Sequence, residues 1–204
     1  MSEISAKEVM ELRRQTGAGM MDTKKALVEA GGDHDKAREI LMVKGLADAK
    51  KKESREADTG TIGHYLHYQT ERPVVGCLVE LRCETDFVAK SPEFQNAARD
   101  LAMHLAAARP RWVRRDQVPE DAIAEQSKLY AAQAAEQGKP ADVAEKIVAG
   151  KLGSFFKDTV LYEQQFVNPE KFEGTVESML EQLTARLGEK ITVGAIARVA
   201  LGED

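Results

Sequence analysis

A short connector near the middle of the chain has the sequence Glu84-Thr85-Asp86-Phe87-Val88-Ala89-Lys90. The preceding segment, 73–83, is rich in β-branched and apolar residues, which predicts a strand. The following segment begins Ser91-Pro92 and then places apolar residues at helical spacing, which predicts a helix with a serine N-cap. Connectors lie at the surface and are mostly polar, so a phenylalanine beside an aspartate is unusual here. Such an aromatic tip, held between a strand and a helix, can act as an anchor in a partner's pocket.

The residues alone leave two interpretations of this connector open. Phe87 and Val88 could fold back over the end of the sheet, with Thr85 or Asp86 capping a helical turn. Alternatively, the connector could project Phe87 outward for binding. For an arbitrary protein the covering arrangement is the commoner of the two.

The overall composition narrows the class of protein. The chain of 204 residues can bury a sizeable core and could hold a small second domain. Its net charge of −5 argues against sequence-independent binding of nucleic acid, including DNA, through the whole surface. The first residues show neither a basic n-region nor an apolar h-region, so we expect no leader sequence, and no segment approaches the ~20 apolar residues of a membrane span. We therefore expect a cytoplasmic location without membrane association.

Residues 1–47 are expected to form a docking module of three short helices. A capping box at 5–8 starts the first helix, which breaks at 16–19. Asp22 or Thr23 can cap the second helix, and glycines separate it from the third. Because three helices of this length enclose little core, the module is expected to dock on a partner, with no catalytic role.

The rest of the chain is expected to be a linker at 48–58 and an α+β core at 59–204. Strands are predicted at 61–68, 73–83 and 191–201 from alternating or continuous apolar residues. Three antiparallel strands with helices packed on one side give an α+β fold, which follows the N-terminal three-helix bundle. The remaining helices are predicted at 91–108, 119–137, 140–152, 155–163 and 176–187.

The histidines and cysteines do not suggest a catalytic constellation. His64 is expected to be buried or half-buried on a strand face, and His104 to be a surface or boundary residue of a helix. Cys77 and Cys83 share a strand face roughly 20 Å apart, too far for a disulfide or a common metal ion. We expect reduced, structural thiols, no metal and no cofactor. An enzyme that uses Cys83 with a histidine is a rival hypothesis.

Two further segments could be mistaken for ligand sites. The glycines at 17–19 follow a helix, and no Gly-Lys-Ser/Thr comes after them, so we expect no direct nucleotide binding. The segment 109–115 is a basic loop with one tryptophan, for which RNA contact is conceivable. The acidic total favours a solvated loop whose Trp112 packs on neighbouring helices.

Two long motifs carry a family resemblance. Residues 12–27, LRRQTGAGMMDTKKAL, closely resemble the N-terminal signature of the translation elongation factor Ts family. Residues 80–90, ELRCETDFVAK, resemble its second signature, and segments 161–167 and 187–191 agree as well. The resemblance spans essentially the whole chain. It implies the compact form of the family, with one copy of the core subdomain and no coiled-coil insertion.

The resemblance implies guanine-nucleotide exchange on elongation factor Tu, the GTPase that delivers aminoacyl-tRNA to the ribosome. By this resemblance, a tip intrudes beside the partner's magnesium site, dislodges Mg²⁺ and promotes GDP release so that GTP can bind. No covalent chemistry is needed, so the chain is not expected to be an enzyme. The tip is formed by Thr85, Asp86, Phe87 and Val88. The N-terminal module grips a helix of the same partner domain through Arg13, Met20 and Met21.

Two further expectations concern assembly. Compact members of the family tend to dimerise through their sheets, which implies a homodimer and a two-to-two complex with the partner. A rival hypothesis is a binding module of another class, because residues up to about Gly45 resemble ubiquitin-associated domains, which bind ubiquitin-like partners. That hypothesis leaves residues 85–90 without a role.

Overall fold

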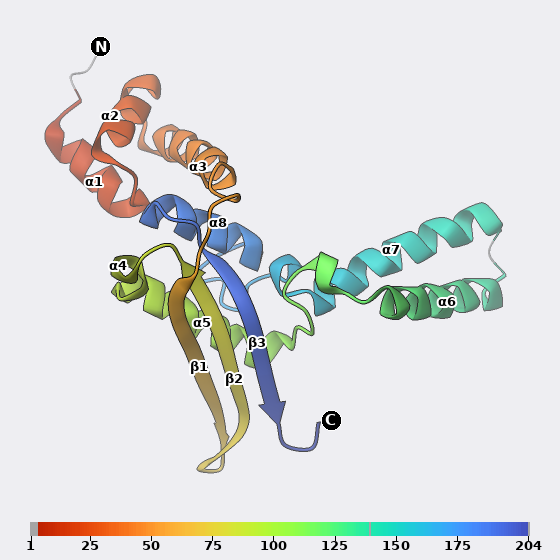
Figure 1. Ribbon diagram of the computed structural model, residues 1–204. Coiled ribbons are helices and arrows are strands. Elements are labelled where there is room, and N and C mark those ends of the chain that lie inside the picture. Colours follow the sequence, from red (N-terminus) through yellow and green to blue (C-terminus); the bar gives the residue numbers. More distant parts are fainter. Residues whose placement is uncertain (1–3, 139, 204) are drawn as a thin grey trace. The chain divides into compact units, whose positions relative to one another are not determined.

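The computed structural model describes residues 4–138 and 140–203, apart from the side chain of Leu46. Residues 1–3, 139 and 204, which belong to the predicted module and core, lie outside the described residues. The elements are α1 (Ala6–Thr16), α2 (Met20–Glu29), α3 (His34–Lys50), β1 (Thr59–Gln69), β2 (Arg72–Cys83), α4 (Asp86–Ala89), α5 (Pro92–Ala108), the 3₁₀ turn η1 (Arg115–Gln117), α6 (Glu120–Glu136), α7 (Ala141–Thr159), the 3₁₀ turn η2 (Leu161–Glu163), α8 (Val176–Leu187) and β3 (Thr192–Ala200) (Figure 1).

The first three helices pack around a small apolar core of their own. The predicted capping box is confirmed, because Ser5 and Glu8 exchange hydrogen bonds at the start of α1. The second helix begins at Met20, with Gly19 as its N-cap, so the prediction of a cap at Asp22 or Thr23 is wrong. An extended glycine can precede a helix without a side-chain cap. The buried core residues are Val9, Leu12, Ala26, Leu27, Ala37 and Leu41.

The strands form one sheet in the order β1-β2-β3, and the predicted α+β fold is confirmed. Alternation along β2 buries Cys77, Val79, Leu81 and Cys83 on one face. Helix α5 packs closely on β1, since a Cβ at Gly63 would overlap the carbonyl oxygen of Ala98. The buried side chains of α5 are Phe94, Ala98, Leu101, Ala102 and Leu105.

The opposite face of the sheet is open. His64 is exposed together with its apolar neighbours on β1, so the prediction of a buried or half-buried histidine is wrong. His64 does share a strand face with apolar side chains, but alternation alone does not show whether that face is covered.

The chain divides into two compact units that share strands and helices. One unit comprises Met1–Thr61, Leu81–Asn96 and Ser178–Thr192. The other comprises Ile62–Glu80, Ala97–Glu177 and Val193–Asp204. The first unit therefore contains the N-terminal helices, the connector after β2 and the turn before β3.

Helices α6 and α7 pack side by side as a hairpin (Figure 1). Helices were predicted here at 119–137 and 140–152, and both are confirmed. The predicted break between 152 and 155 is absent, because α7 is continuous. A glycine at 153 costs only about 1 kcal/mol of helix propensity, whereas burial of Phe155 and Phe156 contributes roughly 1.5–3 kcal/mol each.

His104 is fully buried, so its prediction as a surface or boundary residue is wrong. Its Nδ1 accepts a hydrogen bond from the Val167 N–H at 3.3 Å, so Nε2 carries the proton and donates to Gln164 Oε1 at 2.9 Å. The ring also stacks on Phe166. Burial lowers the pKa of His104, which keeps the imidazole neutral and structural.

Candidate partner-binding site

The connector after β2 folds into one capped helical turn. Thr85 is extended, with φ −131° and ψ 154°, and its hydroxyl accepts a hydrogen bond from the Val88 N–H. The turn, α4, is followed directly by Ser91, whose hydroxyl donates to the Val88 carbonyl at 2.8 Å. The same hydroxyl accepts the Phe94 N–H at 3.3 Å, which confirms Ser91 as the cap of α5. Side chains therefore fix both ends of this turn.

The exposure of the turn decides between the two interpretations of the connector. Phe87 is 89% exposed, whereas Ala89 is buried and Val88 is half-buried. Capping by Thr85 is confirmed, but the phenylalanine does not cover the sheet. Asp86 and Lys90 form an ion pair at 2.9 Å with both side chains exposed, so this pair stabilises the turn little. The turn presents an uncovered aromatic ring on a fixed backbone.

The base of the turn is tied to the segment that precedes β3. The Lys190 N–H donates to Glu84 Oε1 at 2.6 Å, and Arg55 lies 3.3 Å from the same oxygen. The hydrogen bond from Lys190 and the contact with Arg55 lower the pKa of the Glu84 carboxyl. Glu84 therefore stays ionised at neutral pH and links three separate segments of one unit.

Cys83 has a structural place beneath this turn. Its side chain is fully buried, and its thiol donates to the Thr85 carbonyl at 3.3 Å. Burial raises the pKa of the Cys83 thiol, which disfavours the thiolate needed for nucleophilic chemistry. Cys77 is buried as well, and both cysteines are free, as predicted. These observations argue against the rival thiol-enzyme hypothesis.

The N-terminal residues of the predicted site flank the loop between α1 and α2. Arg13 is exposed in the last turn of α1, and Gly17 caps that helix with a positive φ of 70°. Met20 and Met21 are 43% and 65% exposed at the start of α2. Within the described residues, no hydrogen bond or ion pair joins these three side chains to the tip. They form a second exposed group in the same unit.

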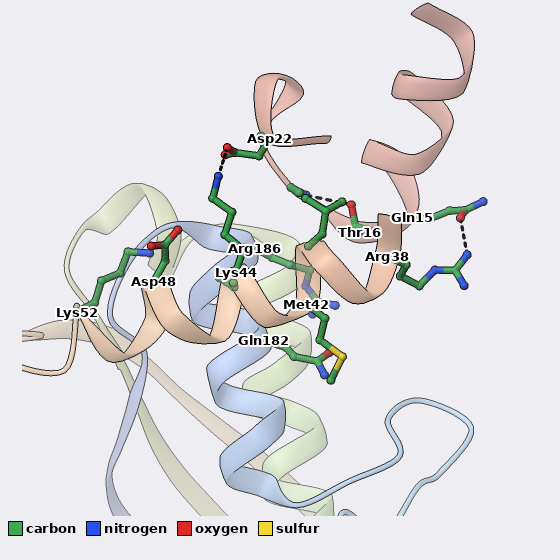
Figure 2. Close-up of a pocket in the computed structure, with 15 residues that line it drawn as sticks. Gln15, Thr16, Asp22, Arg38, Met42, Lys44, Asp48, Lys52, Gln182 and Arg186 are labelled. Atoms are coloured by element: carbon green, nitrogen blue, oxygen red, sulfur yellow. Dashed lines mark hydrogen bonds and ion pairs between the residues drawn. The ribbon is translucent and has the colours of Figure 1, made fainter. Parts of the chain in front are cut away.

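A cavity of about 250 Å³ lies between the N-terminal helices and α8 (Figure 2). Charges of both signs line it, and Lys44 pairs with Asp22 at its edge. The Arg38 guanidinium donates to Gln15 Oε1 at 3.1 Å on the other side. Neither the tip nor Met20 and Met21 line this cavity, so it is separate from the predicted site.

Two tertiary contacts in this unit were not predicted from the sequence, and the first of them supports the tip. The Glu189 carboxylate accepts hydrogen bonds from the backbone at the base of the tip. Arg186 pairs with Glu93 at the start of α5 at 2.7 Å, and its aliphatic part packs against Gly17. The motif at 187–191 contains Glu189 and was noted only because it resembles the family. It could not show the contact itself, because Glu84 and Thr85 lie about a hundred residues away in the chain.

Other potential sites have structural explanations. Trp112 packs edge-on against Phe155, and Arg115 makes a bidentate pair with Glu163, which supports the solvated-loop interpretation of the basic segment. In the described part of the chain, no group of three or more His, Cys, Asp or Glu side chains could hold a metal ion. None of the helices described is both long and apolar enough to cross a membrane.

Fold and site together define a protein-binding factor, built from a small helical module and an α+β core that presents an exposed aromatic tip. The family described as "Elongation factor TS" matches residues 47–203. The chain is 48% identical over 200 residues to an elongation factor Ts of Thermosipho melanesiensis, covering 98% of this chain and 100% of the relative. It is also 48% identical over 203 residues to an elongation factor Ts of Anaeromyxobacter sp. strain K, covering 100% and 90%.

The chain therefore belongs to the elongation factor Ts family. The function of this family is guanine-nucleotide exchange on elongation factor Tu during protein biosynthesis, as the sequence motifs predicted, and this is the function of the chain.

Proposed function

We propose that the chain releases GDP from elongation factor Tu by inserting the tip formed by Thr85, Asp86, Phe87 and Val88 beside the magnesium site of the partner. Asp86 and Phe87 enter the GTPase domain, and Thr85 and Val88 complete the intruding surface. The intrusion dislodges Mg²⁺ and disturbs the phosphate-binding loop, so GDP leaves and GTP can bind. The chain forms and breaks no covalent bond in this process and is not an enzyme.

The observation that carries this proposal is the exposure of Phe87 on a capped turn. At 89% exposure, the ring retains almost all of its apolar surface for a partner. Burial of the ring in the complex would contribute about 1.5–3 kcal/mol to the free energy of binding. This gain opposes the cost of the strain imposed on the magnesium and phosphate site of the partner. GDP and this chain are both ligands of elongation factor Tu, and their binding is coupled reciprocally. GDP must therefore lower the affinity of elongation factor Tu for this chain by the same factor by which the chain lowers its affinity for GDP.

The direct test is release of a fluorescent GDP analogue from purified elongation factor Tu. Catalytic amounts of the chain are expected to accelerate release strongly. If the folded chain gives no acceleration with a partner of matched source, the proposed mechanism is wrong, and binding of a ubiquitin-like partner becomes the better hypothesis.

We further propose that Arg13, Met20 and Met21 grip a helix of the partner's GTPase domain. The methionines are flexible and polarisable, which suits a surface that adapts to a partner. Their position on both sides of one short loop supports a common contact. The cytoplasmic location belongs to the same proposal, because elongation factor Tu works with the ribosome.

Replacing Met20 and Met21 together by alanine is expected to raise the half-saturating concentration of the chain about tenfold. A change of this size is expected when one or two interface contacts are lost. The rate of nucleotide release at saturation should change less, because the tip is unaltered. A titration of nucleotide release against chain concentration separates the two quantities. Met10→Ala is the matched control, since Met10 is 61% exposed on α1. Unchanged affinity in the double variant would remove the N-terminal module from the mechanism.

We also propose a homodimer formed through the open face of the sheet, giving a two-to-two complex with the partner. Ile62, Leu66 and Tyr68 alternate along β1 and are 57%, 48% and 57% exposed. Leu78 on β2 is 49% exposed, and Leu66 lies against Gly76 on that neighbouring strand. A group of exposed apolar side chains on one sheet face is typical of a protein interface.

Leu66→Asp is expected to convert the dimer into a monomer, because the two-fold axis of a homodimer places the new charge in the buried interface twice. The molar mass by light scattering, measured over a range of concentrations, reports this change. Leu129→Asp on α6 is the control, because Leu129 is also 48% exposed but lies outside the sheet. A wild-type chain that remains monomeric at all concentrations would contradict the dimer.

The domain organisation that fits these roles is a docking module at 1–47, a linker at 48–58 and a core and dimerisation domain at 59–204. Support for the module comes from the separate apolar core of α1, α2 and α3. Support for the linker comes from its turns and exposed charges after α3.

A further inference from the structure

The carboxylate of Glu189, which is distant in sequence, forms hydrogen bonds at the base of the tip. Glu189 follows Gly188, which ends α8 with a positive φ of 76°. Its Oε2 accepts hydrogen bonds from the N–H groups of Glu84 at 3.0 Å and Thr85 at 2.9 Å. Its Oε1 accepts the Thr85 hydroxyl at 2.6 Å. The turn between α8 and β3 thus brings an acceptor to three donors at the start of α4.

We propose that Glu189 is a positioning residue for nucleotide exchange, because its carboxylate holds the start of α4 so that Phe87 is presented before the partner arrives. This inference rests on the proposed tip mechanism. A carboxylate suits the position, because it only accepts hydrogen bonds and the groups facing it are all donors. Glu189 itself contacts no part of the partner in this proposal and acts through Thr85.

The local structure of the tip requires such support. A helix of one turn is not stable alone, because nucleation fixes several residues for a single hydrogen bond. The Thr85 hydroxyl caps the Val88 N–H at 3.5 Å, which is long for a hydrogen bond. The contacts with Glu189 are shorter, and they fix the residue that caps the turn. The tertiary contact therefore defines the orientation of α4 better than the local cap does.

The two segments are linked in both directions. The Glu84 N–H donates to Glu189, while the Lys190 N–H donates to the Glu84 carboxylate at 2.6 Å. The Lys190 ammonium in turn donates to the Glu53 and Arg55 carbonyls at 2.7 Å. A tip held in this way enters a partner without the entropy loss of ordering a loop, which is the benefit of preorganisation.

The test compares Glu189→Ala with Glu189→Gln in the full chain. Glu189→Ala removes the carboxylate that holds the start of α4. If α4 then adopts the orientation that presents Phe87 only a tenth of the time, the rate of nucleotide release at saturation should fall about tenfold. The amides of Glu84 and Thr85 should lose protection from hydrogen exchange, while the rest of the chain keeps it. Glu189→Gln should recover most of the rate, because the amide oxygen accepts the backbone donors and the amide nitrogen can donate to Thr85. Glu56→Ala, which removes the same charge from an exposed residue of the same unit, should be unaffected.

The outcomes separate this inference from the tip mechanism. Full exchange in Glu189→Ala, together with lost exchange in Phe87→Ala, would overturn the positioning role alone. Full exchange in both variants would overturn the tip mechanism on which it rests. Equal loss in the alanine and glutamine variants, or loss of amide protection throughout the chain, would show a general structural role and also overturn the inference.

Discussion

Phe87→Ala is expected to leave the fold intact and to remove most of the exchange activity. The ring is 89% exposed, so its removal costs the free protein little, within about 0.5 kcal/mol for a surface substitution. In the complex, the lost burial of about 1.5–3 kcal/mol corresponds to a roughly 10- to 100-fold lower rate of nucleotide release. The measurement is release of a fluorescent GDP analogue, with circular dichroism and urea unfolding to confirm the fold.

The matched control for this prediction is Leu129→Ala, which removes an exposed apolar side chain from α6. It should retain the wild-type rate, so that a loss in Phe87→Ala is specific to the tip. A folded Phe87→Ala chain with the full rate of exchange would show that the aromatic ring does not act on the nucleotide site.

Gly63→Ala is expected to destabilise the fold by about 1–3 kcal/mol, the usual cost of forcing an additional group into a packed core. The new Cβ would overlap the carbonyl oxygen of Ala98, and a backbone atom of α5 cannot move aside as the end of a flexible side chain can. Either β1 or α5 must shift, which disturbs the packing between strand and helix. Urea unfolding measures the change in free energy through a lower midpoint.

Gly150→Ala is the control for the general effect of glycine replacement. Gly150 lies within α7, and a Cβ there would have nothing within 4 Å. Alanine should therefore leave stability unchanged or raise it by up to about 1 kcal/mol, as expected for helix propensity. Equal stability of Gly63→Ala and the wild type would contradict the close packing of β1 on α5.

Much of the fold could be predicted from local patterns. Helical spacing and the capping box predicted the N-terminal helices, because a cap and an amphipathic stripe involve residues within a few positions of one another. Alternation predicted the strands for the same reason. The break expected between 152 and 155 was wrong, because burial of the two phenylalanines in α7 outweighs the low helix propensity of glycine.

The sequence by itself determined the family, the α+β class and the position of the tip, since motifs and periodicity are properties of neighbouring residues. Only the tertiary structure decided that Phe87 projects outward, that His104 is buried, and that Glu189 supports Thr85. His104 pairs with Gln164 sixty residues further on, and Glu189 meets Thr85 across 104 residues. Burial and long-range hydrogen bonds depend on which distant segments the chain brings together, and no local pattern contains that information.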